Sequence, residues 1–342
     1  MEMRAIVLRE FGGPGVLRVG EFETPKPGPG EVLVRVKAVG VNRLDIWIRS
    51  GKYRIRPPHI PGTDVAGVVE EVGRNVGNID VGERVVVYPL ESCGSCEYCL
   101  KGEESMCINS KLLGRHMNGG YAEYVKVRAD MVFRIPEKVG FKDAAAIPVN
   151  FLTSWHMLFN RTKLSPGDRI LVIGGGSGIG YAAIELAKLA GASVIATVGE
   201  DWKIEKAKSI GADYVVNRRR EDVYEAVMKI TDGEGVDIVF EHAGKDVWPT
   251  ALKVLKRGGT LVFAGATSGD EVNVSIRQLY WNQLNLHGSF LGNKDEFRKI
   301  LKLLAEGRIK PIIDSVYRLE DASEAHRKME ASKHFGKLVL EP

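Results

Sequence analysis

The chain has 342 residues, of which 44% are hydrophobic and 27% are charged, and its net charge is +4. This composition excludes disordered and fibrous proteins, and the length suggests two domains of about 150 residues each. The longest basic run, Arg218–Arg220, is followed directly by two acids, so no nucleic-acid partner is expected. No apolar stretch approaches the ~20 residues of a membrane span, and the first residues lack the apolar core of a signal peptide. We therefore expect a soluble, cytoplasmic protein without a membrane partner.

The first 150 residues are β-rich. Residues 31–39, 65–72 and 84–87 are short runs of alternating or β-branched residues, and they are separated by Pro- and Gly-rich segments such as 24–30. Such runs are typical of strands, and the segments between them are typical of loops. This part of the chain therefore predicts a small all-β domain.

Four cysteines fall within fifteen residues of this domain. Cys93, Cys96, Cys99 and Cys107 have the spacing of thiolates that converge on one tetrahedral zinc ion. Two disulfides are the alternative, but they would not persist in a reducing cytosol. A site with four thiolates has no open position, so the sequence predicts a structural zinc in a lobe at about residues 91–110.

After residue 150 the pattern changes to alternating strands and helices, which predicts a doubly wound parallel sheet of the α/β class. The expected strands are 169–173, 193–198, 214–216, 236–240, 260–263 and 286–289, and the expected helices are 181–190, 203–210 and 223–230. The last fifty residues add a helix at 296–306 and two strands, near Val316 and at 338–340. They are too few for a domain, so we expect residues 1–150 and 291–342 to form one domain and 151–290 the other.

A glycine-rich turn follows the first strand of the second domain. Read as G-x-G-x-x-G, the turn places Gly175, Ser177 and Gly180 in the motif, with serine at the middle position. Between a strand and a helix, such a turn lets backbone N–H groups reach a pyrophosphate. The spacing also fits short-chain dehydrogenases, but no tyrosine has the lysine four residues later that those enzymes use. The expected nucleotide-binding residues are Gly175, Gly176, Ser177, Gly178, Ile179, Gly180, Gly199, Lys203, Arg218 and Gly265.

The end of the second strand distinguishes NAD from NADP. An acid there binds the ribose 2′-hydroxyl, whereas cations accommodate a 2′-phosphate. Val198 stands where the acid is expected, and Lys203 and Arg218–Arg220 are nearby cations. The sequence thus favours NADP, although Glu200 and Asp201 follow closely and leave NAD possible.

These features together resemble the medium-chain dehydrogenase/reductase superfamily, which includes zinc alcohol dehydrogenases and quinone oxidoreductases. The resemblance rests on the four-cysteine lobe, the segment Gly119–Tyr124, and Ala144–Pro148 before the second domain. It covers nearly the whole chain. It implies a GroES-like catalytic domain, a Rossmann domain, and an active site in the cleft between them.

The residues that would bind a catalytic zinc in this superfamily differ here. The matching positions are Asn42, Thr63 and Asn150, and amide and hydroxyl groups are poor zinc ligands. Positions that resemble the proton relay of alcohol dehydrogenases hold Leu44 and Trp47. The catalytic zinc is therefore expected to be absent, while the structural zinc is kept.

The expected function is reduction of a bulky apolar ketone, quinone or conjugated enone by hydride transfer from NADPH. Without a Lewis acid, Asn42, Thr63 and Asn150 are the expected hydrogen-bond donors to the substrate oxygen, and water supplies the final proton. A zinc alcohol dehydrogenase with other ligands and a nucleotide-binding protein without turnover remain alternatives. The resemblance also implies a homodimer or homotetramer that joins through the edge at Tyr280–Gly292.

Several other side chains have a structural interpretation beside a functional one. Asp45 and Asp64 are expected to pair with Arg43 or with lysines rather than to act as acids. Trp47 and Tyr53 could line an apolar pocket or pack in the core. Three histidines remain: His59 is expected in a loop and His156 in packing, and His116 could face the cleft.

Overall fold

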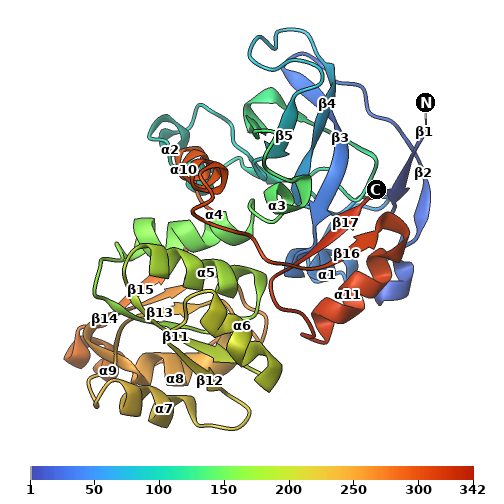
Figure 1. Ribbon diagram of the computed structural model, residues 1–342. Coiled ribbons are helices and arrows are strands. Elements are labelled where there is room, and N and C mark those ends of the chain that lie inside the picture. Colours follow the sequence, from blue (N-terminus) through green and yellow to red (C-terminus); the bar gives the residue numbers. More distant parts are fainter. Residues whose placement is uncertain (1) are drawn as a thin grey trace. The chain divides into compact units, whose positions relative to one another are not determined.

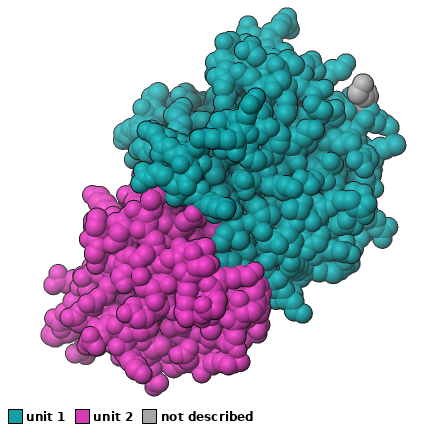
Figure 2. All heavy atoms as spheres, in the orientation of Figure 1, with its two compact units in different colours: residues 1–149, 292–342 teal, residues 150–291 magenta. Residues whose placement is uncertain are grey.

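The computed structural model describes residues 2–342, which form two compact units (Figures 1 and 2). One unit contains the chain up to Val149 and resumes at Gly292–Pro342, and the other is Asn150–Leu291. The first unit is therefore assembled from two segments that are far apart in the sequence. Within residues 2–342, no helix has the length and apolar character needed to cross a lipid bilayer.

The first unit is built around a mixed sheet, which has seven strands in the described chain. Its strands follow the order β16-β17-β3-β4-β5-β9, and β8 also pairs with β3. The pairings of β3 with β4, β8 and β17 are antiparallel, whereas β16 and β17 are parallel. The sheet strands are β3 Glu31–Gly40, β4 Asp64–Val72, β5 Arg84–Val87, β8 Tyr124–Arg128, β9 Val132–Arg134, β16 Ile313–Arg318 and β17 Lys337–Glu341.

Shorter elements complete this unit. Two hydrogen-bonded pairs of strands, β1 with β2 and β6 with β7, lie outside the main sheet. The short strands are β1 Glu2–Ile6, β2 Val19–Glu23, β6 Leu90–Glu91 and β7 Lys111–Leu112. The helices are α1 Arg43–Arg49, α2 Glu97–Leu100, α3 Phe141–Ala145, α10 Lys294–Ala305 and α11 Ala322–Glu330.

The C-terminal segment completes the sheet of the first unit. In β17, Val339 lies opposite Gly40 and Leu340 lies opposite Val39 of β3. Helix α11, which follows β16, was not expected from the sequence. Its buried residues, Ala322, Ala325, His326 and Met329, occupy positions i, i+3, i+4 and i+7. That spacing is the mark of an amphipathic helix, but two of the four residues are small alanines and one is a histidine, so the apolar signal is weak.

The second unit is a six-stranded parallel sheet within residues 150–291. Its order, β12-β11-β10-β13-β14-β15, is the 3-2-1-4-5-6 order of a doubly wound fold, which confirms the predicted fold class. Helices α5 and α6 lie on one face of this sheet, and α7, α8 and α9 lie on the other (Figure 1). The strands are β10 Arg169–Val172, β11 Ser193–Val198, β12 Tyr214–Asn217, β13 Val236–Glu241, β14 Leu255–Phe263 and β15 Asn285–Gly288.

The helices of this unit include two that the sequence pattern did not predict, α8 and α9. Helix α9 exposes Ile276, Tyr280 and Trp281, so its apolar residues do not form a buried stripe that periodicity could detect. Strand β14 also begins at Leu255, earlier than expected, next to an irregular register with β13. The helices are α4 Asn150–Trp155, which continues as a π-helix at His156–Arg161, α5 Gly178–Leu189, α6 Ile204–Ser209, α7 Val223–Ile230, α8 Trp248–Lys253 and α9 Ile276–Asn282.

Candidate functional site

The glycine-rich turn between β10 and α5 leaves no room for a side chain at Gly175 or Gly180. Gly174 has a φ of +71°. A Cβ at Gly180 would lie 2.2 Å from the carbonyl oxygen of Gly174, and one at Gly175 would lie 2.9 Å from Ile184. Ser177, at the middle position of the motif, accepts the N–H of Gly180 through its Oγ at 2.9 Å and caps α5. Serine therefore contributes to the turn here by starting the helix.

The start of α5 is suited to hold a pyrophosphate. The first N–H groups of a helix have no partner inside it, and the helix dipole favours an anion at that end. With the N–H of Gly180 bonded to Ser177, those of Gly178 and Ile179 are the donors of the first turn. Because a dinucleotide needs this close approach of backbone to phosphate, the turn fits the group.

Asn150, at the start of the second unit, supports this turn. It is the buried first residue of α4, and a Cβ placed on Gly178 would lie 2.6 Å from its Nδ2. Asn150 therefore packs against the glycine-rich turn of its own unit, and the preceding residue, Val149, donates its backbone N–H to Oδ1 of Asp64 at 3.0 Å.

The ends of β11 and β12 hold a cluster of charges. The backbone N–H of Arg218 donates to the carbonyl oxygen of Val198 at 3.0 Å, and a Cβ at Gly199 would lie 3.3 Å from the Arg218 guanidinium. The two acids that could have bound a ribose hydroxyl are engaged by arginines. Glu200 pairs with Arg219 and Asp201 with Arg220. This arrangement leaves the Arg218 guanidinium above Gly199.

Two further predicted nucleotide-binding residues lie near the carboxyl ends of the strands. Lys203 is buried at the turn after β11, with its Nζ 5.1 Å from the centroid of the Trp202 ring. Gly265 follows β14 with a φ of +100°, and a Cβ there would lie 3.1 Å from the carbonyl oxygen of His242. Both are at the edge of the sheet where doubly wound folds bind nucleotides.

A buried ion pair lies beside Asn42 in the first unit. The Nζ of Lys337 lies 2.6 Å from Oδ2 of Asp64 and donates to Oδ1 of Asn42 at 2.7 Å. The Nδ2 of Asn42 donates to the same Oδ2 of Asp64 at 2.9 Å. Asn42 is only 7% exposed, and Asp64 and Lys337 are buried. Burial raises the pKa of Asp64, while the charge of Lys337 acts to lower it.

Lys337 was not identified from the sequence, although Asp64 was expected to pair with a lysine. One lysine at the start of the apolar run Leu338–Leu340 is the signal that could have indicated a buried cation. In a strand whose neighbours are buried, a charged side chain requires a partner.

Thr63 does not fit its predicted role as a donor to substrate. Its side chain is fully buried, and its hydroxyl donates to the carbonyl oxygen of Leu113 at 3.0 Å. A hydroxyl has one hydrogen to donate, so that of Thr63 is already used. Its contact instead joins the loop before β4 to the loop after β7.

A chain of hydrogen bonds fixes the backbone around Asn42. The carboxylate of Asp45 accepts the N–H of Asn42 at 2.8 Å and the N–H of Gly62 at 3.3 Å. The hydroxyl of Tyr121 donates to Asp45 at 3.1 Å, and its oxygen lies 3.1 Å from Nε2 of His326. Asp45 therefore holds together the two loops that carry Asn42 and Thr63.

The chain of hydrogen bonds continues through Arg49 to Glu330 at the surface of the unit. The Nη1 of Arg49 lies 3.3 Å from Nδ1 of His326, and its Nη2 pairs with Glu330. Because arginine only donates, Nδ1 of His326 accepts, and Nε2 carries the hydrogen that points to Tyr121. Burial, followed by the charges of Arg49 and Arg43, lowers the pKa of His326 to about 3.

The expected pairing of Asp45 with Arg43 is wrong, because Arg43 donates to the carbonyl oxygen of Met329 at 3.1 Å. Two of the histidines considered in the sequence have backbone partners. His59 is buried with its Nε2 2.8 Å from the carbonyl oxygen of Gly114, and the Nδ1 of His116 accepts the N–H of Leu112 at 2.8 Å. His156 is buried in the second unit.

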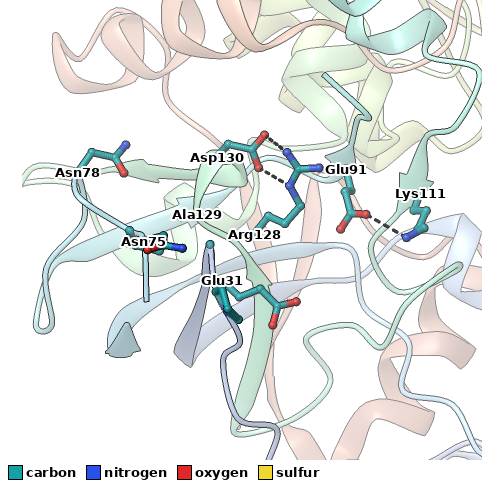
Figure 3. A pocket seen from close by; sticks show the side chains of 11 residues that line it. Glu31, Asn75, Asn78, Glu91, Lys111, Arg128, Ala129 and Asp130 are labelled. Carbon is teal, nitrogen blue, oxygen red and sulfur yellow. Dashed lines mark hydrogen bonds and ion pairs between the residues drawn. The ribbon is translucent and has the colours of Figure 1, made fainter. Parts of the chain in front are cut away.

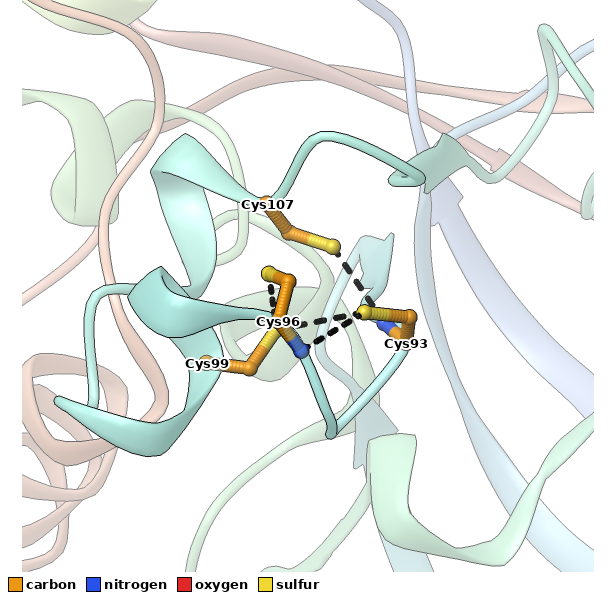
Figure 4. A group of neighbouring side chains, drawn as sticks. All are labelled: Cys93, Cys96, Cys99 and Cys107. Atoms are coloured by element: carbon orange, nitrogen blue, oxygen red, sulfur yellow. Dashed lines mark hydrogen bonds between the residues drawn. The ribbon is translucent and has the colours of Figure 1, made fainter.

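The four cysteine thiols converge at one point (Figure 4). Their Sγ atoms all lie within 4.8 Å of one another, and they form the one cluster of three or more potential metal-binding His, Cys, Asp or Glu side chains among residues 2–342. Zn–S bonds of 2.3 Å in a tetrahedron place sulfur atoms about 3.8 Å apart. The separations of Cys93 and Cys96 from Cys99, 3.9 and 3.5 Å, match this spacing.

The electrostatics of the lobe also suit a cation. The backbone N–H groups of Ser95 and Cys96 lower the pKa of Cys93 to about 5, which favours the thiolate that binds metal. Burial and the neighbouring thiols raise the pKa of Cys99 to about 12. The donor set thus fits a structural zinc that has no open position.

Comparisons with known proteins agree with both units. Residues 28–137 match the family described as alcohol dehydrogenase GroES-like domain, and residues 178–306 match zinc-binding dehydrogenase. An alcohol dehydrogenase of Geobacillus stearothermophilus is 35% identical over 99% of both chains. The chain belongs to the medium-chain dehydrogenase/reductase superfamily.

Other superfamily members show the range of relatives. The quinone oxidoreductase of Homo sapiens is 31% identical over 99% of this chain and 97% of that protein. The solved structure of an NAD-dependent alcohol dehydrogenase has a TM-score of 0.96 at 42% identity, and covers 99% of this chain and 100% of its own. This superfamily member is therefore an oxidoreductase that uses a nicotinamide nucleotide.

The low pKa of His326 predicts a specific pH dependence. The unfolded chain takes up a proton on this histidine below pH 6.5, whereas the folded protein does so only near pH 3. Stability contributed by neutral His326 is therefore present above pH 6.5 and is lost as the pH falls toward 3. The stability difference between wild type and His326→Gln should shrink by about 2 kcal/mol between pH 6.5 and pH 5.

Urea unfolding at pH 7, 6.5, 6 and 5 measures this difference. The same substitution at His287, which is half-buried in the second unit, is the control. A difference between wild type and His326→Gln that stays constant over this range would show that the ring is not held neutral.

Proposed function

We propose that this protein is an NADP(H)-dependent reductase that has no catalytic zinc and that reduces a carbonyl or a conjugated enone. The bound nicotinamide supplies a hydride to the substrate carbon. The protein must then stabilise the negative charge that develops on the substrate oxygen, and water supplies the final proton. The observation that carries the proposal is the contact of Lys337 and Asp64 with Asn42.

Asn42 is the proposed donor to the substrate oxygen. Its amide has two Nδ2 hydrogens, and one of them is bonded to Asp64. The other is left for the substrate. The ammonium of Lys337 on Oδ1 polarises the amide and strengthens its N–H groups as donors, because linked hydrogen bonds in a buried site reinforce one another.

The same contacts argue against a catalytic metal at this position. A zinc ion bound through Asn42 would lie next to the ammonium of Lys337, which already occupies Oδ1. The hydroxyl of Thr63 points to a backbone carbonyl, and neither residue offers the thiolate or imidazole that zinc prefers. The positive charge of Lys337 beside Asn42 therefore favours stabilisation of the substrate oxygen by a hydrogen bond over binding of a zinc ion.

Metal analysis distinguishes this proposal from a zinc-dependent alcohol dehydrogenase. We expect one zinc ion per chain by plasma mass spectrometry, bound by the four cysteines. A Cys99→Ser variant should reduce this content, while Asn42→Ala should leave it unchanged. Two zinc ions per chain in the wild type would favour the zinc-dependent enzyme instead.

The proposed role of Asn42 predicts a large effect on turnover. Asn42→Ala should lower kcat for a reactive enone or ketone about a hundredfold, the loss typical of one donor to a developing oxyanion. The affinity for NADPH and the zinc content should not change. Asn78→Ala, at an exposed amide in the same unit, is the control. Full activity of Asn42→Ala in stopped-flow assays would contradict the assignment.

The preference for NADP over NAD rests on Arg218. Its guanidinium lies over Gly199, and both nearby acids are paired with other arginines. Arg218→Ala should weaken NADPH binding about tenfold or more and change NADH binding little, since a bond to a charged phosphate contributes about 1.5–3 kcal/mol. Fluorescence titration of both nucleotides measures this. Equal loss for the two would show that Arg218 does not contact the 2′-phosphate.

The edge of the second unit supports the expected association of identical chains. Strand β15 is the last strand of the sheet, and Tyr280, Trp281 and Phe290 beside it are 63%, 63% and 48% exposed. An edge strand with exposed aromatic residues is suited to pair with a second copy of itself. We therefore propose a dimer or tetramer formed through Tyr280–Gly292.

A further inference from the structure

The first unit carries a group of cations on a stretch of chain that contains no acids. From Ile46 to Thr63 the chain has no aspartate or glutamate, but it has Lys52, Arg54 and Arg56 on its surface. The loop after β7 adds Arg115. Within residues 2–342, the guanidinium groups of Arg54, Arg56 and Arg115 have no carboxylate at ion-pair distance.

Two of these cations are fixed on aromatic rings. The guanidinium of Arg115 lies 4.3 Å from the centroid of the Tyr53 ring, and the Nζ of Lys52 lies 4.9 Å from that of Trp47. The two rings contact each other edge to face, with centroids 5.7 Å apart. The four side chains therefore form one continuous surface, which we call the cation–aromatic cluster.

The guanidinium of Arg115 has N–H donors that no residue of the described chain accepts. Its Nε is buried and has no hydrogen-bond partner among residues 2–342. A guanidinium has five N–H donors, and stacking on an aromatic ring leaves its edge available for a planar anion. Since the Nε is buried, the terminal N–H groups of the guanidinium are the donors that an anion would contact.

The cation–aromatic cluster is joined to the loops that carry the proposed donor. A Cβ on Gly114, directly before Arg115, would lie 2.8 Å from the backbone of Gly62. Trp47 lies on α1, which begins directly after Asn42, so the two residues are separated by about 7–8 Å along the helix axis. A substrate of modest length could therefore contact both.

A polar hollow elsewhere in this unit provides a contrast (Figure 3). It has a volume of about 570 Å³ and also contains cations. There Arg128 is paired with Asp130, and Lys111 is paired with Glu91. Because these cations are paired with acids that line the same hollow, the hollow attracts an anion less strongly than the cation–aromatic cluster.

We propose that the cation–aromatic cluster binds an anionic group of the substrate, so that the compound reduced carries a carboxylate or a phosphate. Arg115 donates to the anion, Lys52 adds its charge, and Trp47 and Tyr53 contact the apolar part of the same molecule. This inference rests on the proposed function for the reaction, but it replaces a wholly apolar substrate with an amphipathic one.

Binding without turnover tests the cluster separately from the reaction. Ligand-observed NMR titrations of the protein with NADP would compare hexanoate, hexyl phosphate and hexanamide, which share one alkyl chain. At least one anion should bind about tenfold or more tightly than the amide, and its affinity should fall with added salt. Tighter binding of hexyl phosphate than of hexanoate would assign the group as a phosphate, and the reverse order would assign a carboxylate.

Variants localise the effect. Arg115→Met keeps the alkyl stem over Tyr53 and should abolish the preference for the anion, whereas Arg115→Lys should retain part of it. Arg74→Met, at an exposed arginine of the same unit, is the matched control. If Arg115→Met unfolds the protein, as judged by circular dichroism, Lys52→Met supplies the second test and should weaken anion binding.

Turnover then connects the cluster to the reaction. With 4-oxo-2-pentenoate and its methyl ester, kcat/KM of the wild type should favour the acid, and Arg115→Met should reverse this while the ester is affected less than about threefold. Equal affinity for hexanoate, hexyl phosphate and hexanamide would overturn the inference. Anion binding in the absence of any turnover would instead count against the proposed function and leave the cluster in place.

Discussion

The ion pair of Lys337 and Asp64 is the interaction on which the first unit depends. Lys337 begins β17, the strand that returns from the end of the chain, and Asp64 begins β4. Removing one partner of such a pair would leave a buried charge and cost about 3–5 kcal/mol. The pair therefore constrains the C-terminal strand to one position. It also requires space: a Cβ at Gly40 would lie 2.4 Å from Lys337, so glycine there admits the lysine side chain.

The sequence predicts best those features that depend on local pattern. The parallel strands, the glycine turn and the cysteine lobe all follow from periodicity or from spacing that one ligand imposes. The buried hydrogen-bonded network around Asn42 cannot be predicted in this way. Asn42, Tyr121 and Lys337 are separated by 79 residues or more in the sequence, and they come together only because the strands pair. Thr63 is an example. The sequence indicates Thr63 as a candidate donor to the substrate, but its hydroxyl donates to the carbonyl oxygen of Leu113 in another loop, and the sequence pattern does not predict this contact.

Close packing of glycines explains how two loops become one site. A Cβ at Gly114 would lie 2.8 Å from Gly62, and one at Gly119 would lie 2.1 Å from the carbonyl oxygen of Gly62. The backbone at Gly114 and Gly119 therefore packs directly against the backbone at Gly62, with no side chain between them. The hydroxyl of Thr63 and the ring of His59 then bond to carbonyl groups of Leu113 and Gly114. Because these bonds are buried, the loop that carries Arg115 has little freedom to move relative to Thr63.

The hydrogen-bonded network of Asp45, Tyr121 and His326 contains two groups whose titrations change the stability of the unit in opposite directions. Burial raises the pKa of Asp45 to about 7, so the folded protein holds a proton that the unfolded chain releases near pH 4. Stability from Asp45 is therefore lost as the pH rises from about 4 to 7, whereas stability from His326 is gained as the pH rises from about 3 to 6.5. Over most of this range the two slopes have opposite signs and similar size. The pair can thus keep the backbone of Asn42 and Gly62 in place over several pH units, although each group alone would make the unit sensitive to pH.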